Sequence, residues 1–165
     1  MDAKAINIEL DSNIDAVTSV IGRIEKWLKK YYTQDKVARM ILGISEILFN
    51  GIEHGNLEIS YSEKTDFLDK ALYFAELEKR SKLKKYRDRK VRVTYLCKNG
   101  VVKIVVKDDG NGFDWRKLPE TQDNLYESHG RGVSIARYCF DEVNYNDKGN
   151  EVTLLKKIDP PNARI

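Results

Sequence analysis

The sequence predicts an α+β fold, a two-layer sandwich in which helices cover one face of a single mixed β-sheet. Three observations support this prediction: two early segments with helical periodicity, an Asn-Gly turn between two apolar runs, and a late helix followed by two short strands. The predicted order is strand, two helices, a charged insert, two strands, a loop, a helix and two strands. A chain of 165 residues has the size of one ordinary domain, so residues 1–165 are expected to form a single unit.

The first part of the chain predicts one strand and two amphipathic helices. Residues 5–10 alternate apolar and polar side chains, as a half-buried strand does. Residues 13–32 carry apolar residues at helical spacing, and a polar residue among 11–13 can cap the start. A second helix is expected from about residue 33 to about residue 53. Its apolar stripe consists of Val37, Ile41, Ile44, Leu48 and Ile52.

A charged insert is expected at about residues 57–90, partly helical in conformation. Within it and just beyond, residues 79–92 hold nine basic residues against one acid, Asp88. Such a run is typical of a solvated helix and loop, but it is also a candidate contact for phosphates or for an acidic partner.

The second half predicts a hairpin, a helix and a closing pair of strands. Residues 91–107 form two apolar runs around Asn99-Gly100, and Asn-Gly favours a hairpin because both residues tolerate positive φ. A glycine-rich loop follows, and residues 130–140 are expected to be a helix that begins at a glycine turn. Two short strands are expected within residues 141–157.

Composition excludes several classes of function. No apolar run approaches the roughly 20 residues that a membrane span needs, and the first ten residues lack the pattern of a signal peptide. A cytoplasmic protein without a membrane segment is therefore expected. The net charge of +3 is too small to argue for nucleic acid. Cys97 and Cys139 fit no metal or redox motif and are expected to be free thiols, and two histidines argue against a histidine-based metal site.

The first candidate site lies on the polar side of the second helix. At 100° per residue, Glu46, Asn50 and Glu53, with His54 at the helix end, fall on one face nearly opposite the apolar stripe. Glu46 and Asn50 are four residues apart, so both side chains can reach one ligand. An amide oxygen suits Mg²⁺, and a carboxylate can deprotonate an attacking hydroxyl. A polar face opposite an apolar one is also what any surface helix shows. His54 is interpretable either as a capping residue or as a ligand contact.

Two glycine-rich loops are further candidates. Asp108 begins the loop 108–113, DDGNGF, directly after a strand, where its carboxylate can accept a hydrogen bond from an exocyclic amine. Glycines in such a loop let a ligand approach the backbone, although acidic glycine turns often merely connect elements. The segment 129–133, HGRGV, stands at a helix start, where backbone N–H groups can bind phosphate. This second loop fits neither the P-loop nor the Rossmann pattern.

In combination, these motifs resemble the ATP-binding domain shared by gyrase, Hsp90, histidine kinases and MutL. The likeness is strongest to the branch of anti-sigma-factor serine kinases and related regulatory ATPases. Residues 46–56 are similar to that family's asparagine box, 108–113 to its first glycine box, 129–133 to its second and 149–154 to its closing strand. The resemblance extends from about residue 8 to residue 158.

The resemblance implies a role for each motif. Asp108 is expected to bind the adenine amino group, Asn50 to coordinate Mg²⁺, and Glu46 to act as general base toward a serine hydroxyl or water. Amides of residues 130–132 are expected to bind phosphates, with residues 114–128 as a flexible lid. The other nucleotide contacts that it implies are His54, Gly110, Gly112, Phe113, His129, Gly130, Arg131, Gly132, Val133 and Thr153. The chain departs from many relatives at Asn150, where they carry a threonine that helps to bind adenine.

The function implied by the resemblance is that of a Mg-ATP-dependent serine/threonine kinase that phosphorylates an anti-anti-sigma, STAS-like regulator. A sigma factor and a phosphatase or response-regulator module are further expected partners. The alternative is an ATP-sensing binding module with little or no transfer. Direct binding of nucleic acid rests on the basic run alone and is not expected. A homodimer is a further hypothesis, with the aromatic residues of the first helix, Trp27, Tyr31 and Tyr32, either packed inside or at an interface.

Overall fold

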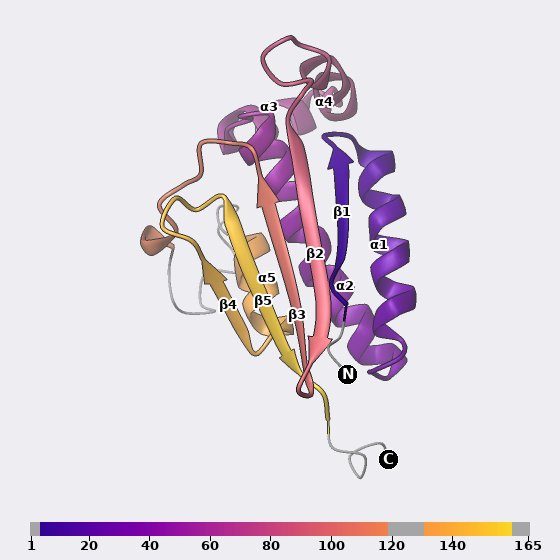
Figure 1. Ribbon diagram of the computed structural model, residues 1–165. Helices are drawn as coiled ribbons and strands as arrows, with labels where there is room; N and C mark the ends of the chain where they lie inside the picture. Colours follow the sequence, from indigo (N-terminus) through magenta and orange to yellow (C-terminus); the bar gives the residue numbers. More distant parts are fainter. Residues whose placement is uncertain (1–3, 119–130, 160–165) are drawn as a thin grey trace.

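The computed structural model describes residues 4–118 and 131–159, and its elements follow the predicted order (Figure 1). The insert contains two short helices, as expected for its charged and partly helical sequence. In chain order the elements are β1 (Ile6–Asp11), α1 (Ile14–Leu28), α2 (Gln34–Asn50), the π-helix η1 (Gly51–Asn56), α3 (Tyr61–Asp69), α4 (Tyr73–Ser81), β2 (Lys90–Lys98), β3 (Val101–Asp108), the 3₁₀-helix η2 (Trp115–Lys117), α5 (Arg131–Cys139), β4 (Glu142–Tyr145) and β5 (Glu151–Lys157).

The five strands form one sheet in the order β1-β2-β3-β5-β4, and every pairing is antiparallel. The α+β fold is confirmed, but the expectation of a mixed sheet is wrong. The connection through α5 does return β4 parallel to β3, because both strands run antiparallel to β5. Since β5 lies between them, no two hydrogen-bonded neighbours are parallel.

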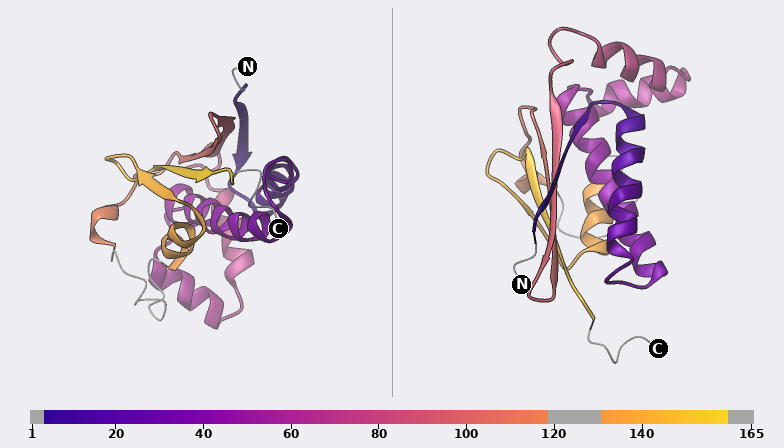
Figure 2. Two further views of the ribbon diagram at one scale, coloured as in Figure 1. Left: turned by 90° about the horizontal axis from the view of Figure 1, so that it is seen from below. Right: turned by 45° about the vertical axis from the view of Figure 1, so that its right-hand side comes forward.

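Helices α1, α2 and α5 cover one face of the sheet, with α2 between the other two, and α3 and α4 project beyond one end (Figure 2). The predicted stripe of α2 faces the core, where its members are buried except for the half-buried Ile41. Full burial of each such side chain contributes on the order of 1.5–3 kcal/mol. The largest fully buried apolar side chains include Ile24, Leu28, Met40, Ile44, Leu48, Ile104 and Leu154.

Local signals in the sequence explain where several elements begin and end. The Asn13 side chain caps α1 by accepting a hydrogen bond from the Ala16 N–H at 2.8 Å. At the predicted hairpin turn, Asn99 has φ +51° and Gly100 has φ +73°. Both values lie in the left-handed region that this turn requires.

The aromatic residues at and just after the end of α1 pack against the core, where Tyr32 is buried and Trp27 and Tyr31 are half-buried. The Tyr32 hydroxyl donates to the Lys156 carbonyl at 2.9 Å, and the Trp27 ring lies edge-on to Tyr95 of β2, with ring centroids 4.8 Å apart. Cys97 and Cys139 are free thiols, as expected. Among the described residues, no helix combines the length and the apolar character that crossing a membrane requires.

Candidate functional site

A cavity of about 510 Å³ opens between the end of α2, the loop after β3 and the turn before β5. This volume lies within the range of small-molecule sites. The cavity brings together segments more than fifty residues apart in sequence. Of the predicted site residues, it is lined by Asn50, His54, Asp108, Gly112, Phe113 and Val133.

Asp108 stands at the end of β3 with its carboxylate largely removed from water. Its Oδ1 accepts a hydrogen bond from the Gly110 N–H at 2.8 Å, and its backbone carbonyl accepts one from Asn150 Nδ2 at 2.9 Å. Burial raises the pKa of Asp108 to about 6, although the Gly110 hydrogen bond and the charge of Lys148 oppose the shift. A buried carboxylate with spare acceptor capacity is suited to bind an amino group of a ligand.

Gly55 allows the helical segment to approach Asp108. A Cβ atom at residue 55 would stand 2.5 Å from the Asp108 Cγ, so no other residue fits without a shift. The next residue, Asn56, is fully buried and accepts a hydrogen bond from the Asp109 N–H at 2.8 Å while donating to Ser12 Oγ at 3.0 Å. The pair 55–56 therefore joins the glycine loop to the helix. Sequence reasoning placed these residues in the asparagine box but did not assign this role.

Glu46 and Asn50 both meet the start of α5. A Cβ atom at Gly132 would lie 2.8 Å from Asn50 Nδ2 and 2.9 Å from Glu46 Oε2. Both side chains are half-buried. Asn50 lines the cavity itself. Glu46, one turn earlier in α2, does not line the cavity but lies beside Gly132.

Glu53 does not share the face of Glu46 and Asn50, contrary to the sequence prediction. The helix continues after Asn50 as a π-helix, and its wider i→i+5 turn changes the direction of the side chains that follow. The Glu53 side chain is only 1% exposed; it forms an ion pair with Lys64 at 2.5 Å and accepts a hydrogen bond from the Tyr73 hydroxyl. Glu53 thus attaches both helices of the insert to the end of α2.

His54 lines the cavity and also stabilises the chain around it. Its Nδ1–H donates to the Ile59 carbonyl, and its ring lies 4.1 Å from that of Tyr61, measured between centroids. His54 thus satisfies a carbonyl near the helix end while it faces the cavity, and its contact with a ligand stays a prediction.

The first glycine loop packs against the turn before β5. Gly112 has φ +75° and lines the cavity, whereas Gly110 is buried behind it against Gly55. Phe113 also lines the cavity, and its ring lies edge-on to Tyr145 at 5.3 Å between centroids. Just beyond, Trp115 Nε1 donates to the Asn146 carbonyl at 2.9 Å, which fixes the beginning of the predicted lid. The remainder of the lid, residues 119–128, lies outside the described residues.

The second glycine loop is described only from Arg131, where α5 begins; the predicted contacts His129 and Gly130 lie outside the described residues. Arg131 is exposed, whereas Gly132 and Val133 are buried at the helix start. The N-terminal turn of a helix offers backbone N–H groups to an anion. This turn lies directly beside Asn50 and Glu46.

Thr153 does not reach the cavity. Side chains alternate between the two faces of the sheet along β5. Val152 and Leu154 both face the helices, and Val152 lines the cavity. Thr153 therefore lies on the opposite face, beside Val105 and Asn144 of the neighbouring strands. Asn150 lines the cavity at the position where relatives are expected to carry threonine.

The beginning of the insert forms one wall of the cavity, which sequence reasoning missed. The additional lining residues include Glu58, Ile59, Ser60 and Tyr61 from this segment and Tyr145 from β4. No sequence motif identifies these residues, because their contact with the cavity depends on the path that the chain takes after the end of α2.

The basic run 79–92 is largely engaged in ion pairs within the protein. Glu58 binds both Lys85 and Arg89, and the Lys85 hydrogen bond is the main cause of its lowered pKa. The pKa of Glu63 falls to about 2, mainly because Arg80 donates a hydrogen bond to its carboxylate. The remaining pairs of the run are Lys79–Glu76, Lys82–Glu78, Arg87–Asp88, Lys90–Asp11 and Arg92 with Glu9 and Asp109. These contacts favour the interpretation of a folded, solvated surface over a free phosphate-binding patch.

The donor set at the cavity fits a magnesium ion held mainly by phosphate groups. Mg²⁺ in nucleotide sites binds one or two protein oxygens together with phosphates and water. Asn50 offers such an oxygen beside the start of α5. Within residues 4–118 and 131–159, no group of three histidine, cysteine, aspartate or glutamate side chains is placed to hold a metal alone.

Comparison with known families identifies one match over most of the chain. Residues 10–156 match the family model of the histidine kinase-like ATPase domain. Comparison with curated proteins found no match. The matched region includes the end of α2, both glycine loops and the closing strand, and so it covers the whole cavity.

Proposed function

Because the chain belongs to the family of histidine kinase-like ATPase domains, we propose that it is an ATP-binding regulatory protein, and more narrowly a serine/threonine kinase of the anti-sigma-factor type. The observation that carries the proposal is that two groups line one cavity and a third lies directly beside it. Asp108 stands at one part of its wall, Asn50 at another, and Glu46 beside Asn50 at the start of α5.

In the proposed complex, each part of the cavity binds one part of the nucleotide. The buried Asp108 carboxylate accepts a hydrogen bond from the adenine amino group, which selects adenine over guanine. The first turn of α5 donates backbone N–H groups to the phosphates. The Asn50 side-chain oxygen binds Mg²⁺, and the ion supplies charge neutralisation on the phosphates.

Catalysis of phosphoryl transfer depends mainly on positioning of the reacting groups and on stabilisation of the charge on the phosphoryl group. In the proposed reaction, the serine oxygen of the substrate protein forms a bond to the γ-phosphorus while the bond to the ADP oxygen breaks. Glu46 accepts the serine proton. Its place beside Asn50 puts this base close to the proposed phosphate site.

A transfer assay with matched variants tests the kinase proposal. Purified protein is incubated with Mg-ATP and a STAS-like anti-anti-sigma protein, and phosphoserine is measured by mass spectrometry. We expect Glu46→Gln to keep ATP affinity within about threefold and to lower the rate of transfer about 10²–10⁴-fold, the usual contribution of a general base. Equal transfer by Glu46→Gln and the native protein would contradict the assigned base, and no transfer by the native protein would contradict the kinase proposal.

A second candidate function, an ATP-sensing binding module, is favoured by the position of the insert. Residues 58–61 line the cavity, and the insert helices bind Glu53 at the end of α2. A bound nucleotide therefore touches the insert directly. Tight ATP binding without transfer, in the presence of the right partner, distinguishes this function from the kinase.

The proposed partners follow from the anti-sigma-factor assignment. They are a STAS-like regulator and a sigma factor, or a phosphatase or response-regulator module, in the cytoplasm; a homodimer is a further proposal. Co-purification of the protein with a candidate partner, with and without Mg-ATP, tests each of them. Binding that is independent of nucleotide would count against regulation by ATP.

A further inference from the structure

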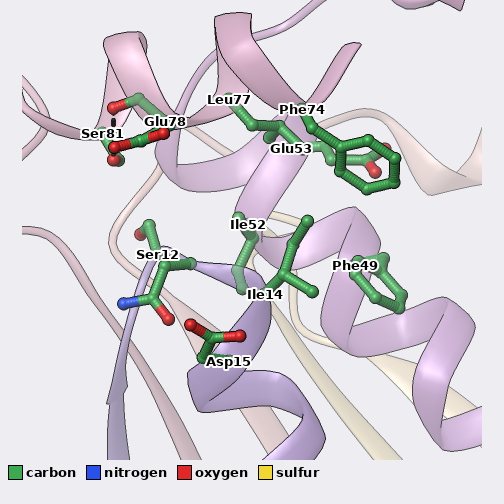
Figure 3. A pocket seen from close by; sticks show the side chains of 11 residues that line it. Ser12, Ile14, Asp15, Phe49, Ile52, Glu53, Phe74, Leu77, Glu78 and Ser81 are labelled. Carbon is green, nitrogen blue, oxygen red and sulfur yellow. Dashed lines mark hydrogen bonds between the residues drawn. The ribbon is translucent and has the colours of Figure 1, made fainter.

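A second cavity, of about 350 Å³, lies between the start of α1, the end of α2 and helix α4 of the insert (Figure 3). It shares a stretch of helix with the first cavity. Asn50, Gly51 and His54 line the first cavity, whereas Phe49 and Ile52 of the same stretch line the second. The two cavities therefore lie on different sides of the end of α2.

Apolar side chains from α1, α2, η1 and α4 form much of the second cavity. Ile52 and Leu77 are buried, and Ile14 and Phe49 are half-buried around them. Phe74 of α4 is 69% exposed although it lines the cavity. In Figure 3, Phe74 and Phe49 lie at the same end of the cavity, on the walls formed by α4 and α2. The exposed ring and the apolar cavity wall together form a contiguous apolar surface, the kind of feature that marks an interaction site.

The charge of this cavity has one sign. Its lining residues include three carboxylates, Asp15, Glu53 and Glu78, and no lysine, arginine or histidine, in a chain whose net charge is +3. Glu53 is already paired with Lys64, whereas the pair of Glu78 with Lys82 is exposed and therefore weak. Such a cavity repels phosphates and attracts a cation.

We propose that the second cavity is a docking site for a segment of a partner protein that presents a large apolar side chain next to a lysine or arginine. The apolar anchor fills the space between Phe49, Phe74 and Leu77. The basic side chain lies near Asp15 and Glu78, where it replaces the exposed Lys82 pair. Docking does not require a nucleotide, so the proposal holds or fails independently of the ATP site.

A protein segment fits this site better than a small molecule does. Most of the Phe74 ring is accessible to solvent, so a ligand enclosed in about 350 Å³ would leave much of it uncovered. A segment that runs across the opening covers the ring and supplies the charge from the next residue. Aromatic side chains at the centre of such contacts commonly carry much of the binding energy.

Binding of a designed peptide tests the proposal on the full chain. The probe is a fluorescein-labelled 12-residue peptide of leucine, tryptophan and lysine, and its control has glutamate in place of lysine. We expect fluorescence anisotropy to show binding of the lysine peptide in the micromolar to low millimolar range, with the control peptide at least tenfold weaker. Backbone NMR shifts on binding are expected at residues 12–15, 49–53 and 74–81.

Exposed substitutions locate the binding without disturbing the core. We expect Phe74→Ala to weaken the lysine peptide about tenfold and Glu78→Lys about fivefold. The matched controls are Leu42→Ala, an exposed apolar residue of α2, and Asp69→Lys, an exposed acid of α3, and neither is expected to change the affinity by more than about twofold.

Three outcomes would overturn the proposal. The first is no binding of the lysine peptide at millimolar concentration to protein whose NMR spectrum shows it folded. The second is equal weakening by the cavity variants and by their controls. The third is binding of free tryptamine as tight as that of the peptide, which would assign the cavity to small organic cations.

Discussion

Burial of the charged Asp108 carboxylate lowers the free energy of unfolding of the ligand-free protein. Burial raises its pKa from 3.8 to about 6, so the folded state holds this proton more tightly than the unfolded state. The stability that comes from this tighter proton binding is therefore fully present below about pH 4 and is lost as the pH rises through 6. The shift corresponds to roughly 2–3 kcal/mol at pH 7. A group that lowers stability in this way is typical of a binding site.

Asp108→Asn is predicted to stabilise the ligand-free protein while abolishing nucleotide binding. Asparagine removes the buried charge but still accepts the Gly110 hydrogen bond. We expect a gain of about 1–2 kcal/mol above pH 6 that disappears below pH 4, measured by urea unfolding across this range. A loss of stability at pH 7 would contradict the assigned cause.

The neighbouring Asp109→Asn provides the matched control. Burial acts against its charge, but hydrogen bonds from Arg92 and from the Lys90 N–H outweigh it and lower the pKa of Asp109. This carboxylate therefore contributes stability above its unfolded pKa that is lost as the pH falls. Its removal is predicted to cost up to about 1 kcal/mol at pH 7 and to leave ATP affinity unchanged.

Gly132→Ala is predicted to impair activity more than stability. The new methyl group would displace the flexible ends of Asn50 and Glu46, while alanine favours the helix by up to about 1 kcal/mol. We expect ATP affinity or turnover to fall at least tenfold with little change in Tm. The control is Gly22→Ala in α1, where a Cβ meets nothing within 4 Å, and it should raise Tm without affecting ATP. Unchanged ATP affinity and turnover in Gly132→Ala would contradict the contact of α5 with this pair.

At the scale of elements, the insert is attached to α2 through the buried charge of Glu53. Lys64→Met leaves that carboxylate without its cation in a site that is 1% exposed. We expect a loss of about 2–4 kcal/mol and faster proteolysis within residues 57–90. Lys70→Met breaks the exposed pair with Asp66 and should cost less than about 0.5 kcal/mol. Equal effects of the two substitutions would show that Glu53 does not hold the insert.

Periodicity predicted the elements well because each has a strong local signal. The apolar stripe of α2 and the Asn99-Gly100 turn lie where the pattern puts them. The prediction failed at Glu53 because the helix widens into a π turn where Gly55 and Asn56 contact the loop after β3. That cause is a tertiary contact, which a window of local sequence does not contain. Thr153 was assigned through the resemblance, whereas the alternation of side chains along β5 turns it away from the cavity.

At the scale of the whole molecule, the main parts of the site were predictable because separate motifs keep the family's order. Asp108, Asn50 and Val133 lie far apart in sequence and line one cavity. The wall that residues 58–61 contribute was not predictable, since it depends on how the charged insert folds back. The mixed sheet failed for a similar reason: the position of β5 between β3 and β4 is a property of topology.

The shared wall predicts that a nucleotide protects the insert. Tyr61 and Ser60 line the cavity and begin α3, so a bound ligand restricts the opening of this helix. We expect Mg-ATP to slow amide hydrogen exchange at residues 57–64 at least severalfold, and exchange at the hairpin turn 98–101 to stay unchanged. Equal exchange in both segments with and without ATP would contradict contact between the nucleotide and the insert.

We propose that Mg-ATP occupies the cavity between α2 and the two glycine loops. Calorimetric titration with Mg-ATP tests it most directly, on the native protein, Asp108→Asn and Asn50→Ala, with Asp109→Asn as the folded control. We expect micromolar binding by the native protein and by Asp109→Asn, and affinity at least tenfold weaker in each of the other two variants. No binding by folded native protein, or equal binding by all four proteins, would contradict it.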